Sequence, residues 1–218
     1  GDNIVNGAGS LDSRILLGHF GAEFENSDLI SVDVTHDYEM LRQSFTPAGS
    51  PTAITPGDYT FTDVAASYAF GSQRRASGSI TVRAGDYYNG TIRSVTVGPG
   101  AMSPGRVSVL KQLSVEPTFS LTRIELPNTA FTTRLARARV DYAFSPLMFA
   151  SGLLQYSSAD RALSTNLRYR WEYAPGSEIF LVYTEERDRT DEQFATPALV
   201  RGLRNRVFVV KINRLLQF

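Results

Sequence analysis

The sequence contains no cysteine, which excludes disulfides, thiolate metal sites and cysteine nucleophiles together. It has no apolar run that approaches the roughly 18 residues of a membrane-spanning helix. Its 22 basic and 22 acidic residues cancel, so the charge favours neither nucleic acid nor an anionic surface as a partner. The glycines of Gly98-Pro99-Gly100 have no helix after them to hold a phosphate. No cofactor is therefore expected.

Alternation of apolar and polar residues, which is typical of strands with two unlike faces, runs through most of the chain. The clearest segment is 163–173, where Leu167, Trp171 and the residues between them at odd positions form an apolar face. The even positions carry polar residues such as Arg168 and Arg170. Apolar faces of this kind often end in an aromatic residue, as a lipid slab bounded by an aromatic girdle requires.

The alternation predicts about eleven antiparallel strands, each long enough to cross a bilayer at a tilt, which takes roughly 9–11 residues. The predicted spans are 12–26, 28–42, 57–71, 75–88, 90–101, 106–122, 129–145, 147–158, 161–174, 177–188 and 205–218. The alternation is weakest in 90–101, 106–122 and 147–158.

The connections between these spans alternate in length. Short ones are expected at 26–28, 71–74, 99–105, 145–146 and 174–177, and longer ones tend to lie between them, at 43–56, 116–128 and 187–204, although 89–90 and 158–161 are brief. Outer-membrane barrels have short periplasmic turns and long outer loops. The last strand would then run from the outside to the periplasm.

The first residues, 1–10, are typical of the interior of a loop. Counting back through about eleven strands places Gly1 outside, whereas bacterial single-chain barrels have an even strand number and periplasmic ends. We therefore expect further strands upstream of Gly1, together with a signal peptide.

The C-terminal segment places apolar residues on one parity and ends in phenylalanine. These residues are Phe208, Val210, Ile212, Leu216 and Phe218. Such an ending is similar to the signal by which the outer-membrane assembly machinery recognises its substrates, and it suits an edge strand that must pair. Arg214 breaks the apolar parity and would have to snorkel to the periplasmic interface.

Several stretches carry a more specific resemblance. They are GHFGAEFEN (18–26), GSQRRASG (71–78), GDYYNG (85–90), DYAFSP (141–146) and LRYRWEYAPGSEIFLVYTEERD (167–188). The chain resembles a family of bacterial outer-membrane proteins of unknown function, in which a C-terminal barrel follows a module that is similar to family-nine carbohydrate-binding modules. The resemblance implies that such a module precedes this chain, and it brings no catalytic residues.

Charged residues on the polar parity are the expected lining of a lumen. They are Arg137, Arg139, Asp141, Arg168, Arg170, Glu172 and Lys211. A salt-bridged, water-filled interior would need them, and so would a selectivity lining for anionic or sugar solutes. Because acidic residues accompany the arginines, the first interpretation is favoured.

The two histidines, His19 and His36, fall in the two strands of one predicted hairpin. No spacing of ligands around them suggests a metal site, and no serine or aspartate stands out as the partner of a catalytic histidine. Tyr59, Tyr87 and Tyr88 could stack on sugars, but aromatic residues at strand ends are more often girdle residues. We expect no catalytic, cofactor or metal site.

The sequence thus predicts an all-β fold: the C-terminal portion of an antiparallel transmembrane β-barrel in the bacterial outer membrane. The expected partners are the lipid bilayer, the assembly machinery and other envelope proteins. The expected role is that of a passive pore, or of a membrane anchor for a periplasmic carbohydrate-binding-like domain. The alternatives are a component of an envelope complex, an embedded hydrolase and a soluble β-sandwich.

Overall fold

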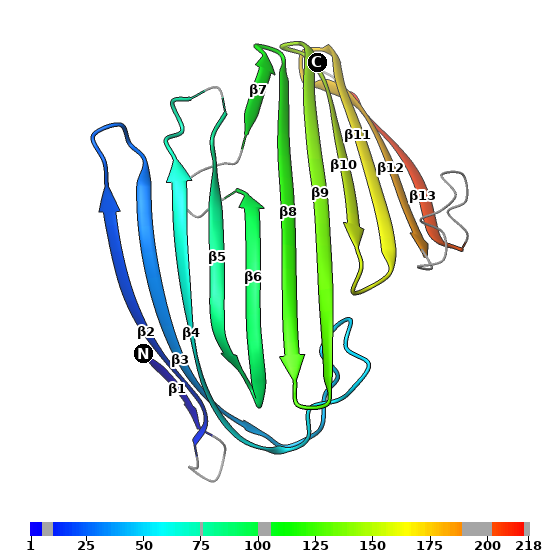
Figure 1. The fold of residues 1–218 in the computed structure, drawn as a ribbon. Coiled ribbons are helices and arrows are strands. Elements are labelled where there is room, and N and C mark those ends of the chain that lie inside the picture. Colours follow the sequence, from blue (N-terminus) through cyan, green and yellow to red (C-terminus); the bar gives the residue numbers. More distant parts are fainter. Residues whose placement is uncertain (6–10, 75, 100–105, 189–201, 216–218) are drawn as a thin grey trace, which may run out of the picture.

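A computed structural model describes residues 1–5, 11–74, 76–99, 106–188 and 202–215, and these form one antiparallel sheet without any helix (Figure 1). The strands are β1 (Asp2–Val5), β2 (Leu11–Glu23), β3 (Leu29–Leu41), β4 (Gly57–Phe70), β5 (Gly78–Tyr87), β6 (Gly90–Gly98), β7 (Val107–Leu110), β8 (Leu113–Leu126), β9 (Thr129–Ser145), β10 (Met148–Ser157), β11 (Ala162–Ala174), β12 (Ser177–Asp188) and β13 (Leu203–Asn213). Each pairs with the next along the chain, except that β8 pairs with both β6 and β7. The predicted all-β antiparallel class is confirmed.

Three predicted spans need correction. Residues 2–5 form β1 against the start of β2, with Asp2 opposite Ile15, although the segment was expected to be a loop. The last strand ends at Asn213, and residues 214–215 of the predicted span are not part of it, while residues 216–218 lie outside the described residues. The predicted strand 106–122 is wrong, because it is divided between β7 and β8.

The division of β7 from β6 has a local explanation in β8. Val97 of β6 pairs with Phe119, and Val107 of β7 pairs with Val115, so β6 and β7 lie along the same side of β8. Pro117 lies between these two pairings. A proline has no N–H to donate to a neighbouring strand, so it is tolerated opposite the interruption. The predicted connection at 116–128 is also wrong, because residues 116–126 belong to β8.

The connections are sorted by length only in part. Residues 42–56, the end of β12 and the start of β13 lie at one end of the sheet, called the long-loop end. The opposite, short-turn end carries the tight connections 146–147 and 175–176. Most of the predicted connections 99–105 and 187–204 lies outside the described residues.

Strand register places most of the apolar residues of the middle of the sheet on one face. A row along paired positions runs from Phe20 through Val32, Ala66, Val82 and Val95 to Leu121. A second row runs through Val140, Gly152, Leu167, Tyr183 and Phe208. This side of the sheet is called the apolar face, and the opposite side is the polar face.

Apolar side chains of this sheet are more exposed than is usual in a water-soluble domain. Phe20, Val82 and Phe208 of the apolar face are 66%, 48% and 64% exposed, whereas Asp63 of the polar face is 3% exposed. The total exposed surface is 14245 Å², whereas a folded monomer of this mass exposes about 9,900 Å². The sheet therefore leaves much of its apolar surface exposed, while a charged group such as Asp63 is buried.

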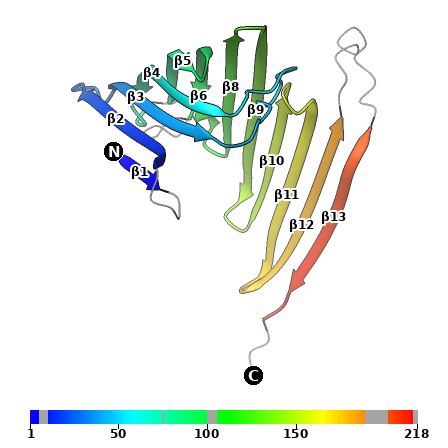
Figure 2. The same ribbon diagram turned by 90° about the horizontal axis from the view of Figure 1, so that it is seen from below.

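Residues 42–56, called the crossing loop, show which face is concave. The loop leaves β3 and reaches β9, where a Cβ added at Gly49 would lie 2.8 Å from Cγ2 of Thr133. Thr133 belongs to the polar face, because it pairs with Thr122 and through it with Ser94 and Arg83. The loop connects the neighbouring strands β3 and β4 but contacts the polar face of the distant strand β9, so the sheet curves toward its polar face, which is the concave one (Figure 2).

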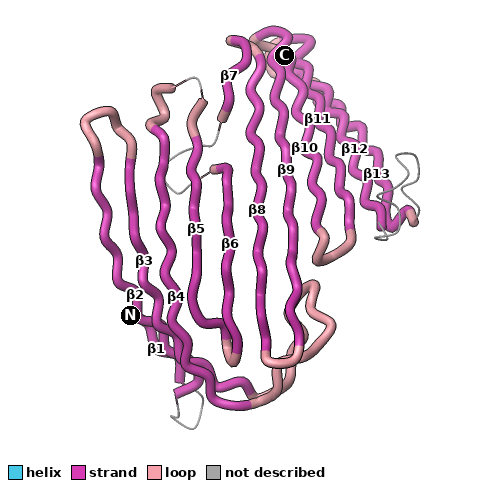
Figure 3. The backbone as a smooth tube through the Cα atoms, viewed as in Figure 1, coloured by secondary structure: helices cyan, strands magenta, loops and turns pink. Residues whose placement is uncertain are grey.

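Within the described residues, β1 and β13 do not pair with each other, so the sheet is curved but not closed (Figures 2 and 3). Both edge strands present unpaired backbone groups. No helix among the described residues is long and apolar enough to cross a membrane.

The turn between β2 and β3 is fixed by Asp28, whose side chain is buried although charged. Its carboxylate accepts hydrogen bonds from the Tyr68 hydroxyl (2.7 Å), the Gly71 amide (2.8 Å) and the Arg74 guanidinium (2.7 Å). Asn26 adds a fourth donor at 3.0 Å. These bonds, led by the one from Tyr68, lower the pKa of Asp28 below its usual 3.8. Asp28 thus joins two neighbouring turns at the short-turn end.

Replacing Asp28 with Asn is expected to lower stability at neutral pH and to remove a pH dependence of the wild type. Because the folded-state pKa lies below 3.8, the wild-type carboxylate contributes fully above that pH and loses its contribution as pH falls through the folded pKa. The measurement is the temperature at which the folded gel band disappears, taken at neutral and acidic pH. Asp160→Asn, in an exposed turn, is the matched control; equal effects of both changes would contradict the role of Asp28.

Candidate functional site: the polar concave face

All the expected lining residues lie on the polar face. They are Arg137, Arg139 and Asp141 on β9, Arg168, Arg170 and Glu172 on β11, and Lys211 on β13. Register links them in rows: Asp141 lies opposite Ser151, which lies opposite Arg168. Arg170 is linked in the same way through Phe180 to Lys211.

These charges are only partly neutralised. Arg139 contacts Asp141, with 3.0 Å between Nε and Oδ2, and Arg170 forms ion pairs with Glu178 and, at 3.8 Å, with Glu172. Arg168 instead donates to the side-chain oxygen of Asn166 at 3.0 Å.

Arg137 and Lys211 have no ion-pair partner among the residues that the structure describes. The five basic groups on β9, β11 and β13 exceed the three acidic groups Asp141, Glu172 and Glu178, which leaves a local positive charge on this part of the concave face. The salt-bridged interior and the selectivity lining both stay predictions.

The best-buried ion pair of the polar face was not singled out from the sequence. Arg83 on β5 holds Asp63 on β4 by two hydrogen bonds, one of them 2.6 Å from Nε to Oδ1. Asp63 is 3% exposed, whereas the Arg83 side chain is 40% exposed. Both residues fall on the polar parity of their strands, but only the register shows that Arg83 lies opposite Ala65 and reaches Asp63 diagonally.

An aromatic cluster anchors the crossing loop at the long-loop end. Phe45 and Ile54 pair within the loop, and the Phe45 ring lies 5.3 Å from that of Tyr88. The Tyr88 ring also lies 5.0 Å from that of Phe61, and its hydroxyl donates to Glu39 at 2.7 Å. Burial, assisted by this hydrogen bond, raises the pKa of Tyr88 above its usual value, which keeps the phenol protonated as a donor.

The three tyrosines that the sequence analysis considered, Tyr59, Tyr87 and Tyr88, all belong to this cluster. Tyr59 and Tyr87 both pack edge-on against Tyr88, at 5.2 Å and 5.0 Å between ring centroids. Tyr59 lies on the polar face, since it pairs with Glu39. These rings contact one another and the crossing loop instead of forming part of a girdle on the apolar face.

A polar cavity of about 620 Å³ lies between the crossing loop, β9 and the turn from β10 to β11. Ser50 and Pro51 of the loop, Thr133 of the polar face of β9 and Arg161 of the turn contribute to its lining, and so does Arg134 of the opposite face, because the cavity lies at the rim of the sheet. The cavity is large enough for several water molecules or a small solute. The crossing loop therefore narrows the concave side without filling it.

The two histidines lie on opposite faces and cannot act together. Nδ1 of His19, on the polar face, lies 2.6 Å from Oδ1 of Asp33, while His36 on the apolar face contacts Thr62 at 2.8 Å. Within the described residues, no hydroxyl forms a hydrogen bond with His19, so its pair with Asp33 lacks an aligned nucleophile. No cluster of three or more metal-ligating side chains occurs in the same part of the chain.

Three residues of the expected assembly signal can be placed. Phe208, Val210 and Ile212 lie on the apolar face of β13 and are 64%, 51% and 65% exposed. Leu216 and Phe218 lie outside the described residues. The placed residues continue the apolar face to the edge of the sheet.

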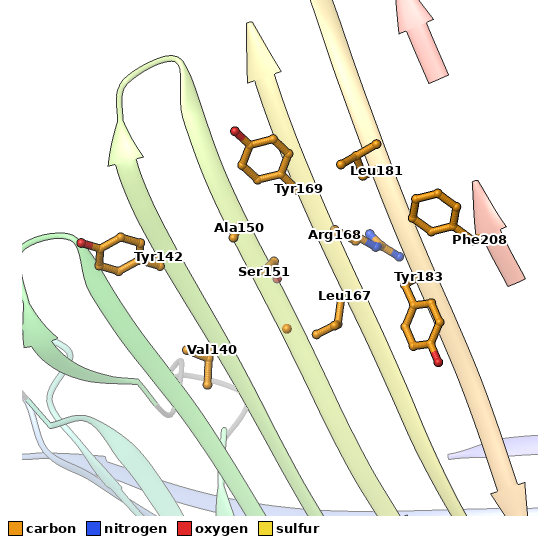
Figure 4. Close-up of a pocket in the computed structure, with 11 residues that line it drawn as sticks. Val140, Tyr142, Ala150, Ser151, Leu167, Arg168, Tyr169, Leu181, Tyr183 and Phe208 are labelled. Atoms are coloured by element: carbon orange, nitrogen blue, oxygen red, sulfur yellow. The ribbon is translucent and has the colours of Figure 1, made fainter. Parts of the chain in front are cut away.

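The apolar face is hollowed over β9 to β12, in a space of about 430 Å³ (Figure 4). Its floor includes the small residues Ala150 and Gly152, and Tyr142, Leu167 and Tyr183 stand around them. Nearly all of its lining is apolar. A hollow of this kind on the exposed side suits hydrocarbon better than water.

Comparison with protein-family models, with curated proteins and with solved structures finds no match to this chain. The family resemblance of the sequence accordingly stays an expectation, and function has to be argued from the geometry.

Proposed function

We propose that this chain is part of a β-barrel of the bacterial outer membrane that serves as a passive pore or as a membrane anchor. The anchored partner would be a periplasmic, carbohydrate-binding-like domain, as the family resemblance implies. Small polar solutes would pass along the concave face under the crossing loop. No step of this role requires a catalytic group.

The reversed distribution of residues carries the proposal. Exposed large hydrophobic side chains lie on nearly every strand of the apolar face, whereas the concave side mixes hydroxyl and charged groups with fewer exposed apolar side chains, such as Leu17, Val207 and Val209. Soluble monomers rarely expose contiguous apolar patches of more than a few hundred Å². Transmembrane barrels have this arrangement because their outer surface contacts lipid.

The aromatic residues of the apolar face support the same proposal. Trp171 and Tyr173 lie together near the short-turn end of β11, with 6.2 Å between ring centroids, and Tyr142 and Phe144 form a similar pair on β9. Amphipathic rings at one edge of an apolar band are typical of a membrane interface.

The test is to fold the chain in detergent, add it to phosphatidylcholine vesicles and record single channels in planar bilayers. A pore predicts stable conductance steps, whereas an anchor predicts insertion with no conductance. A chain that stays folded and monomeric in buffer without detergent, and shows no heat-modifiable gel mobility, would contradict both. Co-purification with other envelope proteins at a fixed stoichiometry would favour the role of a complex component.

A further inference from the structure

Charged residues of the apolar face are confined to one half of the sheet. Within the described strands, all of them lie toward the long-loop end: Asp12, Arg14, Asp58, Asp86, Arg93, Arg123, Glu125, Arg134, Glu185, Arg187 and Arg206. The short-turn half of the face carries apolar and aromatic side chains instead. The apolar band thus has a charged border on one side only.

Arginine is concentrated at one place on this border. Register sets Arg93 of β6 directly opposite Arg123 of β8, and Arg134 of β9 is opposite Leu121, one diagonal step away. Directly opposed residues on one face have Cβ atoms about 4.5–5.5 Å apart, and like charges there are destabilising. Arg93, Arg123 and Arg134 are called the arginine cluster.

Acidic neighbours do not balance the arginine cluster. Glu125 accepts a hydrogen bond from Nε of Arg123 at 2.7 Å. Asp86, on the same face, accepts one from the Thr62 amide at 3.4 Å. Neither Arg93 nor Arg134 forms an ion pair within the described residues, and the side chains of Arg123 and Glu125 are 57% and 46% exposed. The cluster therefore has guanidinium donors available on the exposed face.

We propose that the arginine cluster binds the phosphate group of a membrane lipid whose acyl chains lie against the apolar band. The inference rests on the proposed membrane location. Val95 and Leu121 lie next to the cluster, between it and the rest of the apolar band. The acyl chains of one lipid could therefore contact these apolar residues while its phosphate contacts the arginines. Guanidinium groups bind phosphate by paired, charge-assisted hydrogen bonds, and an anion between Arg93 and Arg123 would relieve their mutual repulsion.

The experiment measures lipid retention by native mass spectrometry on the folded chain in mild detergent. The probes are diphosphoryl lipid A and its monophosphoryl form. The wild type is expected to retain the diphosphoryl lipid, and the double variant Arg93→Gln/Arg123→Gln is expected to retain about thirtyfold less, at the usual contribution of each arginine near an anionic headgroup. Arg134→Gln should give a smaller loss.

The matched control is Arg137→Gln/Arg168→Gln, which removes the same charge from the polar face and should retain the lipid as the wild type does. Heat-modifiable gel mobility shows that each variant folds. Equal retention by the cluster variant and the wild type, or complete displacement of the lipid by inorganic phosphate, would overturn the inference while leaving the barrel in place. Failure of the wild type to enter vesicles would remove the barrel proposal and this inference with it.

Discussion

Replacing residues 46–53 of the crossing loop with a short Gly-Ser turn is expected to raise single-channel conductance severalfold. The loop crosses the concave side between β3 and β9, and Gly49 reaches Thr133 on the polar face. Removing it while keeping Phe45 and Ile54 preserves the pair that closes the loop at its base. The obstacle is then shortened without unfolding the aromatic cluster.

A disulfide that fixes the crossing loop to the turn from β10 to β11 tests the opposite change. Because the chain has no native cysteine, no other disulfide can form within it. A Cβ at position 49 would lie 3.6 Å from Cβ of Ala159, within the roughly 3.5–4.5 Å found in disulfides. The variant is Gly49→Cys/Ala159→Cys, with Thr133→Ser to remove the methyl group that a Cβ at 49 would meet.

Oxidation of this variant should hold the conductance at a steady low level, and reduction should restore fluctuation toward higher levels. Position 49 has φ +83°, so cysteine there costs some stability, and the reduced variant is the proper reference. If the loop replacement and the lock both leave conductance as in the wild type, the loop is not the constriction.

Arg83→Gln is expected to cause the largest loss of stability of any single change on the polar face. It leaves Asp63, 3% exposed, without its cation. Breaking a buried ion pair costs about 3–5 kcal/mol. Because the Arg83 side chain is 40% exposed, solvent screening reduces the expected loss to about 2 kcal/mol.

The measurement is urea unfolding of the folded chain in vesicles, followed by the gel shift. Asp63→Asn should lower the free energy of unfolding less than Arg83→Gln does, because the Arg83 side chain can turn to solvent. The double variant should be more stable than the sum of the two single losses predicts. Arg139→Gln is the control, because its partner Asp141 is 27% exposed and such pairs contribute about 0–1 kcal/mol. Equal losses for Arg83→Gln and Arg139→Gln would contradict the argument.

The strands could be predicted from the sequence because their signal is local. In 163–173, six alternate positions are apolar or hydroxyl-bearing, and a period of two arises within a single strand whatever its neighbours are. The same parity correctly assigned Arg137, Arg168 and Lys211 to one face. Their exposure to a lumen stays a prediction.

Features that depend on distant pairing could not be predicted. Pro117 has a loop signature, and only the interruption between β6 and β7 explains its place inside β8. The pairing of Asp2–Val5 with β2, the path of residues 42–56 to β9, and the contact of Arg83 with Asp63 all require the register of whole strands. A single sequence carries no direct signal for these.

The open edges of the sheet have a consequence for how such a chain could enter a bilayer. One side of β13, over Leu203–Asn213, has no partner strand within the described residues. Each unsatisfied backbone group costs several kcal/mol in hydrocarbon. Transfer of the sheet into lipid would therefore be unfavourable until both edges are paired. On the proposed membrane location, insertion would have to wait until further strands or another chain pair with both edges.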